Sequence, residues 1–386
     1  MTQSNALVVL PAFGNDIAAY VNEVVLPDAM KRLRARVVAR NMLTVNNEDE
    51  SKEVGDTIRV PMPVSFDTHD EFDEVNGTTA TPISVKKVDV KLDKHFYKQV
   101  EFSDMEFTGS MSGAIENALG GMIDVIGRGV NSSIANLALE IPHFSGNLTS
   151  NNKRDQSDLI VLQQAIEQYN VYDDRRIYLT SQSNADLLHV YGTYNYRDVE
   201  SSGVLGNVLN FQPITDNQAI SFKAGSASLN NGLKLAAEAS AGSLILNITA
   251  SAGDRFVKGD VLVVAGTDQT FAVGTTVIAV TGANAVQVTT AVKSTIPAGA
   301  AVEVKGDHRI DLAATPTWAM MATRKLLSPS DQPGVIAGYI TDEVSGLTLQ
   351  SMIWYDAARR KHQFRLETLF GLKVLDHDRA MRMGGH

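Results

Sequence analysis

Residues 103–140, SDMEFTGSMSGAIENALGGMIDVIGRGVNSSIANLALE, form the longest helical pattern in the chain. Ser103 and Glu106 have the spacing of a capping box, which marks the start of a helix. A continuous helix here is a rod of about 57 Å, at 1.5 Å per residue. Its apolar residues recur every three or four positions: Ile115, Leu119, Met122, Ile126, Val130, Ile134 and Leu137.

Six glycines interrupt this helix, at positions 109, 113, 120, 121, 127 and 129. Each weakens a helix by up to about 1 kcal/mol relative to alanine. We therefore predict that the helix bends or that another backbone approaches it closely.

An N-terminal helix is predicted over residues 15–42, with Pro27 breaking or kinking it midway. Its second half is basic, with Lys31, Arg32, Arg34, Arg36 and Arg40 within ten residues. Two interpretations remain open. The basic residues form a solvated helix face, or they belong to an arm that contacts an acidic partner or packaged nucleic acid.

Residues 48–100 alternate apolar and polar side chains on both sides of an acidic, turn-rich stretch at 67–82, which predicts a long two-stranded hairpin. Two strands bury too little to be stable alone in water. The hairpin should therefore lie on its own domain or, if there is no room, on a neighbouring subunit. The stretch DTHDEFDE (67–74) does not fit a calcium-binding loop. A solvated tip that a neighbour's basic patch could attract is favoured over a cation site.

Helix, strand and helix are predicted in turn over residues 157–192, followed by a loop, GVLGNVLNFQPIT (203–215). From 222 to 308 the chain loses most aromatic and charged residues, and short β-rich runs alternate with glycine and asparagine turns. This pattern is typical of a small barrel or sandwich. Residues 309–386 are mostly strand-like and close the domain begun before 222, so 222–308 is interpreted as an insertion.

Composition narrows the function classes. At 386 residues the chain has room for two or three domains, and it contains no cysteine. No signal peptide or membrane span is expected from its N-terminus. The net charge of −10 argues against a protein whose main role is to grip nucleic-acid phosphates.

No common catalytic signature occurs in the sequence: it lacks a phosphate-binding loop, a dinucleotide fingerprint, a nucleophile elbow and a zinc-protease motif. His377 lies between Asp376 and Asp378, but adjacent residues rarely converge on one substrate. The basic run around Arg359, Arg360 and Lys361 is interpreted as a hairpin tip or subunit contact. We expect no enzyme, no cofactor and no metal site.

The order of elements is helical arm, long hairpin, long helix, mixed α/β domain, β insertion and strand-rich closing segment. This order resembles the major capsid protein fold of tailed bacteriophages, which herpesvirus capsid floors and bacterial encapsulin shells share in outline. Locally, the resemblance rests on FRLETLFGLKVLDHDRAMRM (364–383), in which a block from Leu369 to Leu375 precedes an acidic residue and Arg379-Ala380. The β insertion is similar to the extra domain of a podovirus-type coat protein group.

The resemblance implies an α+β fold with six parts. They are an N-terminal arm (1–50), an extended hairpin loop (51–102), a spine helix (103–142), the first part of the peripheral and apical domains (143–221), an inserted small all-β barrel (222–308) and the closing part of those domains (309–386).

The implied function is that of a coat protein that self-assembles as hexamers and pentamers into an icosahedral shell. The shell would form as a procapsid in the host cytoplasm with a separate scaffolding protein and a portal. It would then enclose double-stranded DNA without sequence-specific binding and become part of the virion, with no membrane. The candidate subunit-contact residues are Asp70, Glu71, Asp73, Glu74, Arg32, Arg34, Arg36, Arg359, Arg360 and Lys361.

Two other hypotheses about the function remain open. An encapsulin-like bacterial compartment has the same architecture but encloses a cargo enzyme. A non-catalytic β-rich binding or tail protein would use the β repeats to recognise a ligand, although the long central helix argues against a β fibre.

Overall fold

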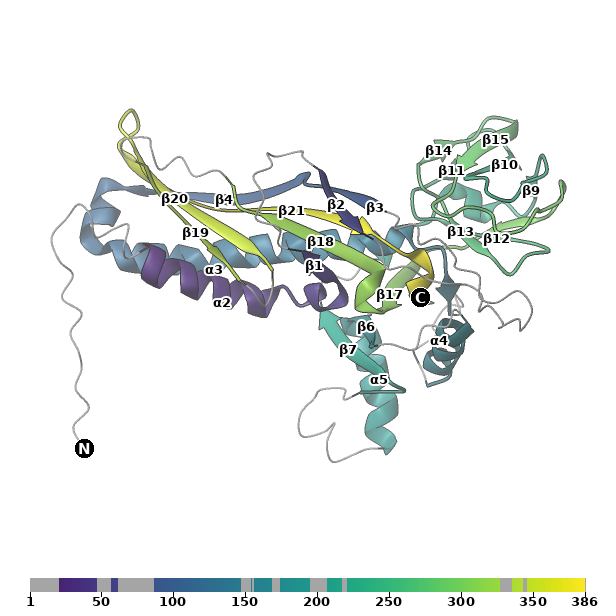
Figure 1. The fold of residues 1–386 in the computed structure, drawn as a ribbon, viewed down its shortest axis with the longest axis horizontal. Coiled ribbons are helices and arrows are strands. Elements are labelled where there is room, and N and C mark those ends of the chain that lie inside the picture. The colour runs from purple at the N-terminus through teal and green to yellow at the C-terminus, as the bar shows by residue number, and fades with distance from the viewer. Residues whose placement is uncertain are drawn as a thin grey trace, which may run out of the picture.

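The computed structural model describes residues 21–46, 57–61, 87–146, 154, 156–168, 174–194, 207–216, 221–326, 335–342 and 346–385. The chain is α+β, with two helices along a long sheet at one end and a β-rich part at the other (Figure 1). The helices are α2 (Leu26–Arg36), α3 (Asp104–Asn136), α4 (Gln156–Gln168) and α5 (Ser181–Tyr194). The short helical turns are η1 (Val21–Val25), η2 (Ala39–Met42), η3 (Leu137–Glu140), η4 (Ser226–Leu229), η5 (Pro316–Trp318) and η6 (His377–Arg379).

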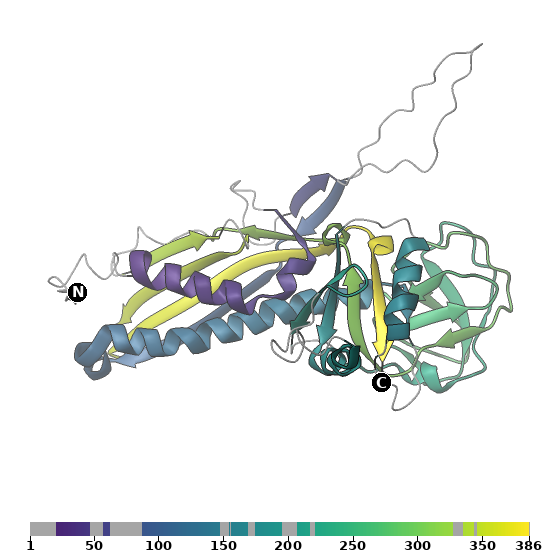
Figure 2. The same ribbon diagram turned by 90° about the horizontal axis from the view of Figure 1, so that it is seen from below.

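The first sheet has six strands and lies against α2 and α3, as both views show (Figures 1 and 2). Its strands are β1 (Thr44–Asn46), β18 (Ala319–Arg324), β21 (Lys361–Val374), β20 (Thr348–Asp356) and β19 (Val335–Thr341), in that order, with β4 (Lys94–Ser103) also paired to β21. Buried residues from both layers form one hydrophobic cluster, which includes Leu33, Ile126, Val130, Phe364 and Phe370.

Two glycines of α3 allow neighbours to approach its backbone. A Cβ atom at Gly127 would lie 3.1 Å from Cβ of Arg36 in α2, and one at Gly129 would lie 3.1 Å from the ring of Phe96 in β4. Neighbours do approach the helix closely at both positions, but with side-chain atoms and not with the backbone that was predicted. Buried Asn131 donates to the carbonyl of Arg36 at 2.8 Å, which fixes the end of α2.

The predicted interruption at Pro27 coincides with a change of helix type. The chain is helical on both sides of it: η1 is a π-helical turn that ends at Val25, and the α-helix α2 begins at Leu26 and ends at Arg36. Pro27 thus lies in the first turn of α2, where a proline is tolerated.

The hairpin prediction is confirmed at its base and wrong for the part of the second strand beyond Lys91. Strands β2 (Thr57–Pro61) and β3 (Lys87–Lys91) pair antiparallel, and residues 62–86 lie outside the described part. The predicted second strand divides after Lys91, since β4 joins β21 in the first sheet. The base also packs on its own chain: Ile58, Val60, Val90 and Leu92 cluster with Met320 and Ala322 of β18.

A second six-stranded sheet lies beyond the end of α3 (Figure 2). Its strands are β5 (Phe144–Ser145), β22 (Ala380–Gly385), β17 (His308–Ala314), β6 (Arg175–Thr180) and β7 (Phe211–Asp216), with β8 (Ser221–Phe222) also paired to β17. Leu162 of α4, Leu187 of α5, Ile177 and Met381 share its core. Strand β7 was predicted as a loop. It lies at the sheet edge, where Pro213 is tolerated within a strand.

The β-rich segment, residues 223–307, contains three small sheets. Its strands are β9 (Lys234–Leu235), β10 (Ile245–Ala250), β11 (Arg255–Phe256), β12 (Val261–Val264), β13 (Thr270–Ala272), β14 (Val277–Ile278), β15 (Gly282–Gln287) and β16 (Val302–Val304). They enclose a hydrophobic cluster of their own, which includes Phe256, Phe271 and Val286. The chain enters and leaves the segment at paired positions, because Phe222 lies opposite His308.

Substitution of Gly371 by alanine should destabilise the protein by about 3 kcal/mol, a cost typical of overpacking. A Cβ atom there would lie 2.3 Å from the Lys91 carbonyl oxygen, and a backbone atom cannot move aside easily. Gly121→Ala is the matched control. It has open space around its Cβ and should gain about 0.5–1 kcal/mol in a helix interior. Urea denaturation of both variants tests this, and an unchanged free energy of unfolding for Gly371→Ala would contradict it.

Candidate contact sites

The three candidate arginines of α2 are paired within the chain. Arg32 contacts Asp28 at 2.8 Å, and Arg36 contacts Asp124 at 2.7 Å. Nε of Arg34 donates to Oδ2 of Asp342 at 2.9 Å, and this bond raises the pKa of Arg34. Their guanidinium groups are half exposed, so the pairs contribute little to stability. Their role as subunit contacts stays a prediction.

The second basic group lies where a hairpin turn was predicted. Arg359 and Arg360 lie in the turn between β20 and β21, and Lys361 begins β21. Arg360 adopts the left-handed conformation at φ 52°, and Asp356 accepts the backbone N–H of Ala358 at 3.0 Å. Lys361 pairs with Glu101 of β4, and hydrogen bonds from Lys361 and Gln363 lower the pKa of Glu101. The turn is confirmed, and its use in assembly stays a prediction.

The four acidic candidates, Asp70, Glu71, Asp73 and Glu74, lie outside the described residues. Within the described ranges, no group of three or more histidine or acidic side chains has an arrangement that could hold a metal ion. No helix in these ranges is long and apolar enough to cross a membrane.

No sequence pattern indicated the buried ion pair between Arg154 and Asp311. Nη2 of Arg154 donates to Oδ2 of Asp311 at 2.9 Å, and both side chains are almost fully buried, at 2% and 0% exposure. Arg154 also donates to the carbonyls of Met383 and Gly384. Asp311 accepts the N–H of Thr180 at 2.8 Å and the hydroxyl of Ser183 at 2.7 Å. This network joins β17, β22, β6 and α5.

Arg382 of β22 connects three parts of the chain. Its buried guanidinium donates to the carbonyls of Ile141 at 2.6 Å, Leu139 at 3.1 Å and Gly259 at 2.8 Å. Gly259 belongs to the β-rich segment, so Arg382 fixes that segment to the end of α3 and η3. We call this contact the joint. Two ion pairs accompany it, Lys258 with Glu140 at 3.0 Å and Lys293 with Asp378 at 3.1 Å.

Two buried titratable groups lie beside the joint. Burial raises the pKa of Asp260 to about 6, although its carboxylate accepts the N–H groups of Val257 and Gly225. Burial lowers the pKa of His308 to about 4. The His308 ring lies 5.1 Å from the Phe144 ring and 5.2 Å from the Phe222 ring. His308 is therefore neutral at pH 7. Asp260 is mostly ionised at pH 7, and its ionisation in this buried place lowers the stability of the folded protein.

The acidic neighbours of His377 hydrogen-bond to other groups. Asp378 accepts from His143 at 2.8 Å, and Asp376 accepts from Arg379 at 3.2 Å. The hydrogen bond from His143, with help from Lys293, lowers the pKa of Asp378 to about 2. Burial lowers the pKa of His377, which favours the neutral form of its ring.

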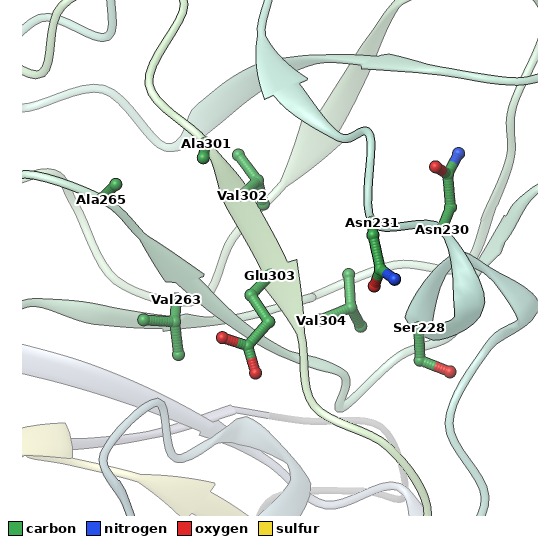
Figure 3. Close-up of a pocket in the computed structure, with 9 residues that line it drawn as sticks. All are labelled: Ser228, Asn230, Asn231, Val263, Ala265, Ala301, Val302, Glu303 and Val304. Carbon is green, nitrogen blue, oxygen red and sulfur yellow. The ribbon is translucent and has the colours of Figure 1, made fainter.

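A cavity of about 350 Å³ lies along β16 and η4 (Figure 3). Its polar groups are largely occupied by partners within the chain. Asn230 donates to Asp254 at 2.6 Å, and Glu303 pairs with Lys305 at 2.7 Å. Valine and alanine side chains form the rest of the lining, so the cavity lacks the convergent polar groups of a catalytic site.

Comparison with known proteins gives matches in structure and none in sequence. No family model and no curated protein matches the chain. The capsid of cyanophage P-SCSP1u is 12% identical over 90% of this chain and 87% of its own, with a TM-score of 0.46. A structure from Mycobacterium phage Che8 is 11% identical over 85% and 84%, with a TM-score of 0.43. A virus-like particle from Pyrococcus furiosus is 8% identical over 94% and 98%, also at 0.43. The solved structures to which the chain is similar thus include phage capsids.

Proposed function

We propose that the chain is the major capsid protein of a tailed phage and has no catalytic role. The observation that carries the proposal is the subunit's architecture. A long helix and a long sheet run side by side, and the β2–β3 pair packs on β18 at the side of that sheet (Figure 2). Such a subunit presents long lateral edges, and contacts repeated around a symmetric shell add up to a stable assembly.

The finer parts of the proposal follow from the resemblance found in the sequence. Hexamers and pentamers would build an icosahedral shell with a separate scaffolding protein and a portal, in the host cytoplasm. The shell would enclose double-stranded DNA without sequence-specific contacts and become part of the virion. The net charge of −10 supports a container that does not bind its DNA tightly.

We also propose that the parts of the subunit follow the boundaries expected from the sequence, with the β-rich segment as an inserted domain. Two observations support the insertion. The segment has its own hydrophobic cluster, and its ends meet at the paired residues Phe222 and His308. Since both residues belong to the second sheet, the inserted part is narrowed to 223–307.

The purified protein, alone or with its scaffold, should form closed shells or sheets visible by negative-stain microscopy. Particles isolated from producing cells and treated with nuclease should then retain double-stranded DNA, which distinguishes a phage shell from an encapsulin-like compartment that retains a cargo enzyme. A stable, monodisperse monomer under every condition tried would contradict the proposal.

Deletion of residues 223–307, with a two-residue Asn-Gly turn joining Phe222 to His308, should leave a folded protein. The two residues are already antiparallel partners, so a short hairpin turn can close the gap. The deletion removes the joint's contact with Gly259 and the ion pairs of Lys258 and Lys293, so a lower Tm is expected. Circular dichroism should still show cooperative unfolding. A chain already unfolded at low temperature would contradict the insertion.

A further inference from the structure

Arg40, in η2, is a half-buried cation without a hydrogen-bond partner in the described part of the chain. Its Nε atom is buried and donates to no acceptor. The segment that carries it, η2, contacts α3, β6 and β7. A guanidinium removed from water in this way is costly unless an anion or acceptor compensates for it.

Two other arginines, Arg34 and Arg176, repel the positive charge of Arg40. Burial lowers the pKa of Arg40, and the like charges of Arg34 and Arg176 lower it further. Asp342 opposes this effect, but both of its carboxylate oxygens accept hydrogen bonds from Arg34.

Arg176 has its own partners, since it pairs with Asp174 at 2.5 Å and donates to the carbonyl of Asn41. Arg34 and Arg176 therefore each pair with a carboxylate, whereas Arg40 does not. The cluster of Arg34, Arg40 and Arg176 carries one positive charge more than its two carboxylates balance.

We propose that Arg40 is a docking site for a carboxylate supplied by a second copy of the chain, with Arg34 and Arg176 beside it. The planar fork of an arginine suits a carboxylate in geometry and charge. The chain itself carries a matching segment, because residues 67–74 contain five carboxylates within eight residues. The inference rests on the proposed self-assembly and names one contact within it.

The charges favour a carboxylate over nucleic-acid phosphate. Binding to a polyphosphate chain usually requires several cations that neutralise neighbouring phosphates, whereas this cluster offers one uncompensated guanidinium. The net charge of −10 also repels a long polyanion.

The test uses the full-length protein before assembly and a fluorescent peptide of sequence DTHDEFDE. Fluorescence anisotropy should show binding to the wild type, and Arg40→Gln should weaken it about tenfold, equivalent to about 1.4 kcal/mol. The matched control is Lys31→Gln, which removes one exposed positive charge from α2 and should bind like the wild type. Arg40→Lys should fall between them, because it keeps the charge and loses the fork.

Equal binding by all four proteins, or by none of them, would overturn the inference. If short duplex DNA lost affinity on Arg40→Gln while the peptide did not, phosphate would be the ligand and the carboxylate assignment would be wrong. Microscopy of the wild type separates this inference from the proposed function. Shells without peptide binding overturn the docking site alone, whereas peptide binding without shells overturns the assembly proposal and leaves the site.

Discussion

Substitution of Arg154 by methionine is expected to lower the free energy of unfolding by about 3–5 kcal/mol, the range found when one partner of a buried ion pair is removed. Asp311 would keep its hydrogen bonds from Thr180 and Ser183 but would lose the buried guanidinium that pairs with it. Two carbonyls, of Met383 and Gly384, would also lose a donor. The second sheet would lose a side chain that bridges β22 and β17, although the two strands would still pair along their length.

A double-mutant cycle separates the ion pair from the lost packing. Asp311→Asn keeps an oxygen acceptor for the N–H of Thr180, and its amide NH2 can donate to the hydroxyl oxygen of Ser183. Arg154→Met combined with Asp311→Asn should therefore be less destabilised than the sum of the single variants. A coupling of about 2 kcal/mol is expected for residues in one network. The control Arg359→Met removes a guanidinium that is 73% exposed and should change stability by less than about 0.5 kcal/mol. Arg154→Met within 1 kcal/mol of wild type would contradict the role of the pair.

Sequence periodicity predicted the elements whose signal is local. The capping box and apolar spacing predicted α3 and its extension η3, and the patterns around α4, β6 and α5 were equally clear. The glycine run also carried spatial information, because Gly127 and Gly129 are the positions that α2 and β4 approach. In each case neighbouring residues along the chain determine the structure.

The wrong predictions concern strands whose position depends on partners that are far away in sequence. The alternation from 83 to 100 continues through Lys91 with no change, yet the chain leaves the hairpin there to join β21. Strand β7 contains a proline and was predicted as a loop, but a parallel neighbour, β6, holds it as an edge strand. Neither partner is near in sequence.

The buried charges were missed for the same reason. Arg154 and Asp311 are 157 residues apart, and Arg154 lies in a polar stretch that reads as a surface loop. Arg382 lies between Met381 and Met383 in a strand, so period-two alternation predicts it on the face opposite to the methionines, as an exposed residue. It is nevertheless fully buried, because three carbonyl partners come from other parts of the chain. Only the folded topology brings these groups together.

Substitution of Arg382 by methionine should loosen the joint and cost about 3–5 kcal/mol of stability. The buried carbonyls of Leu139, Ile141 and Gly259 would each lose a donor, and an unsatisfied buried polar group costs about 1–3 kcal/mol. Limited proteolysis should then release the β-rich segment faster than in the wild type. Arg255→Met, at an exposed site in β11, is the control and should leave the cleavage rate unchanged.

The pH dependence of stability tests whether Arg382 also acts through its charge. The pKa of Asp260, raised to about 6 in the folded protein, means that the folded state holds its proton more tightly than the unfolded state. The contribution of Asp260 to stability therefore falls as pH rises from about 4 to about 6, by about 3 kcal/mol in all, and is constant above.

Arg382 lowers the pKa of Asp260 and nearby Asp307 raises it, so Arg382→Met should raise that pKa further and extend the fall in stability above pH 6. The difference between wild type and Arg382→Met should then be larger at pH 8 than at pH 5. In an Asp260→Asn background the difference should be the same at both pH values, because the titrating group is gone. A difference independent of pH with Asp260 present would mean that Arg382 holds the joint through its three carbonyl bonds alone.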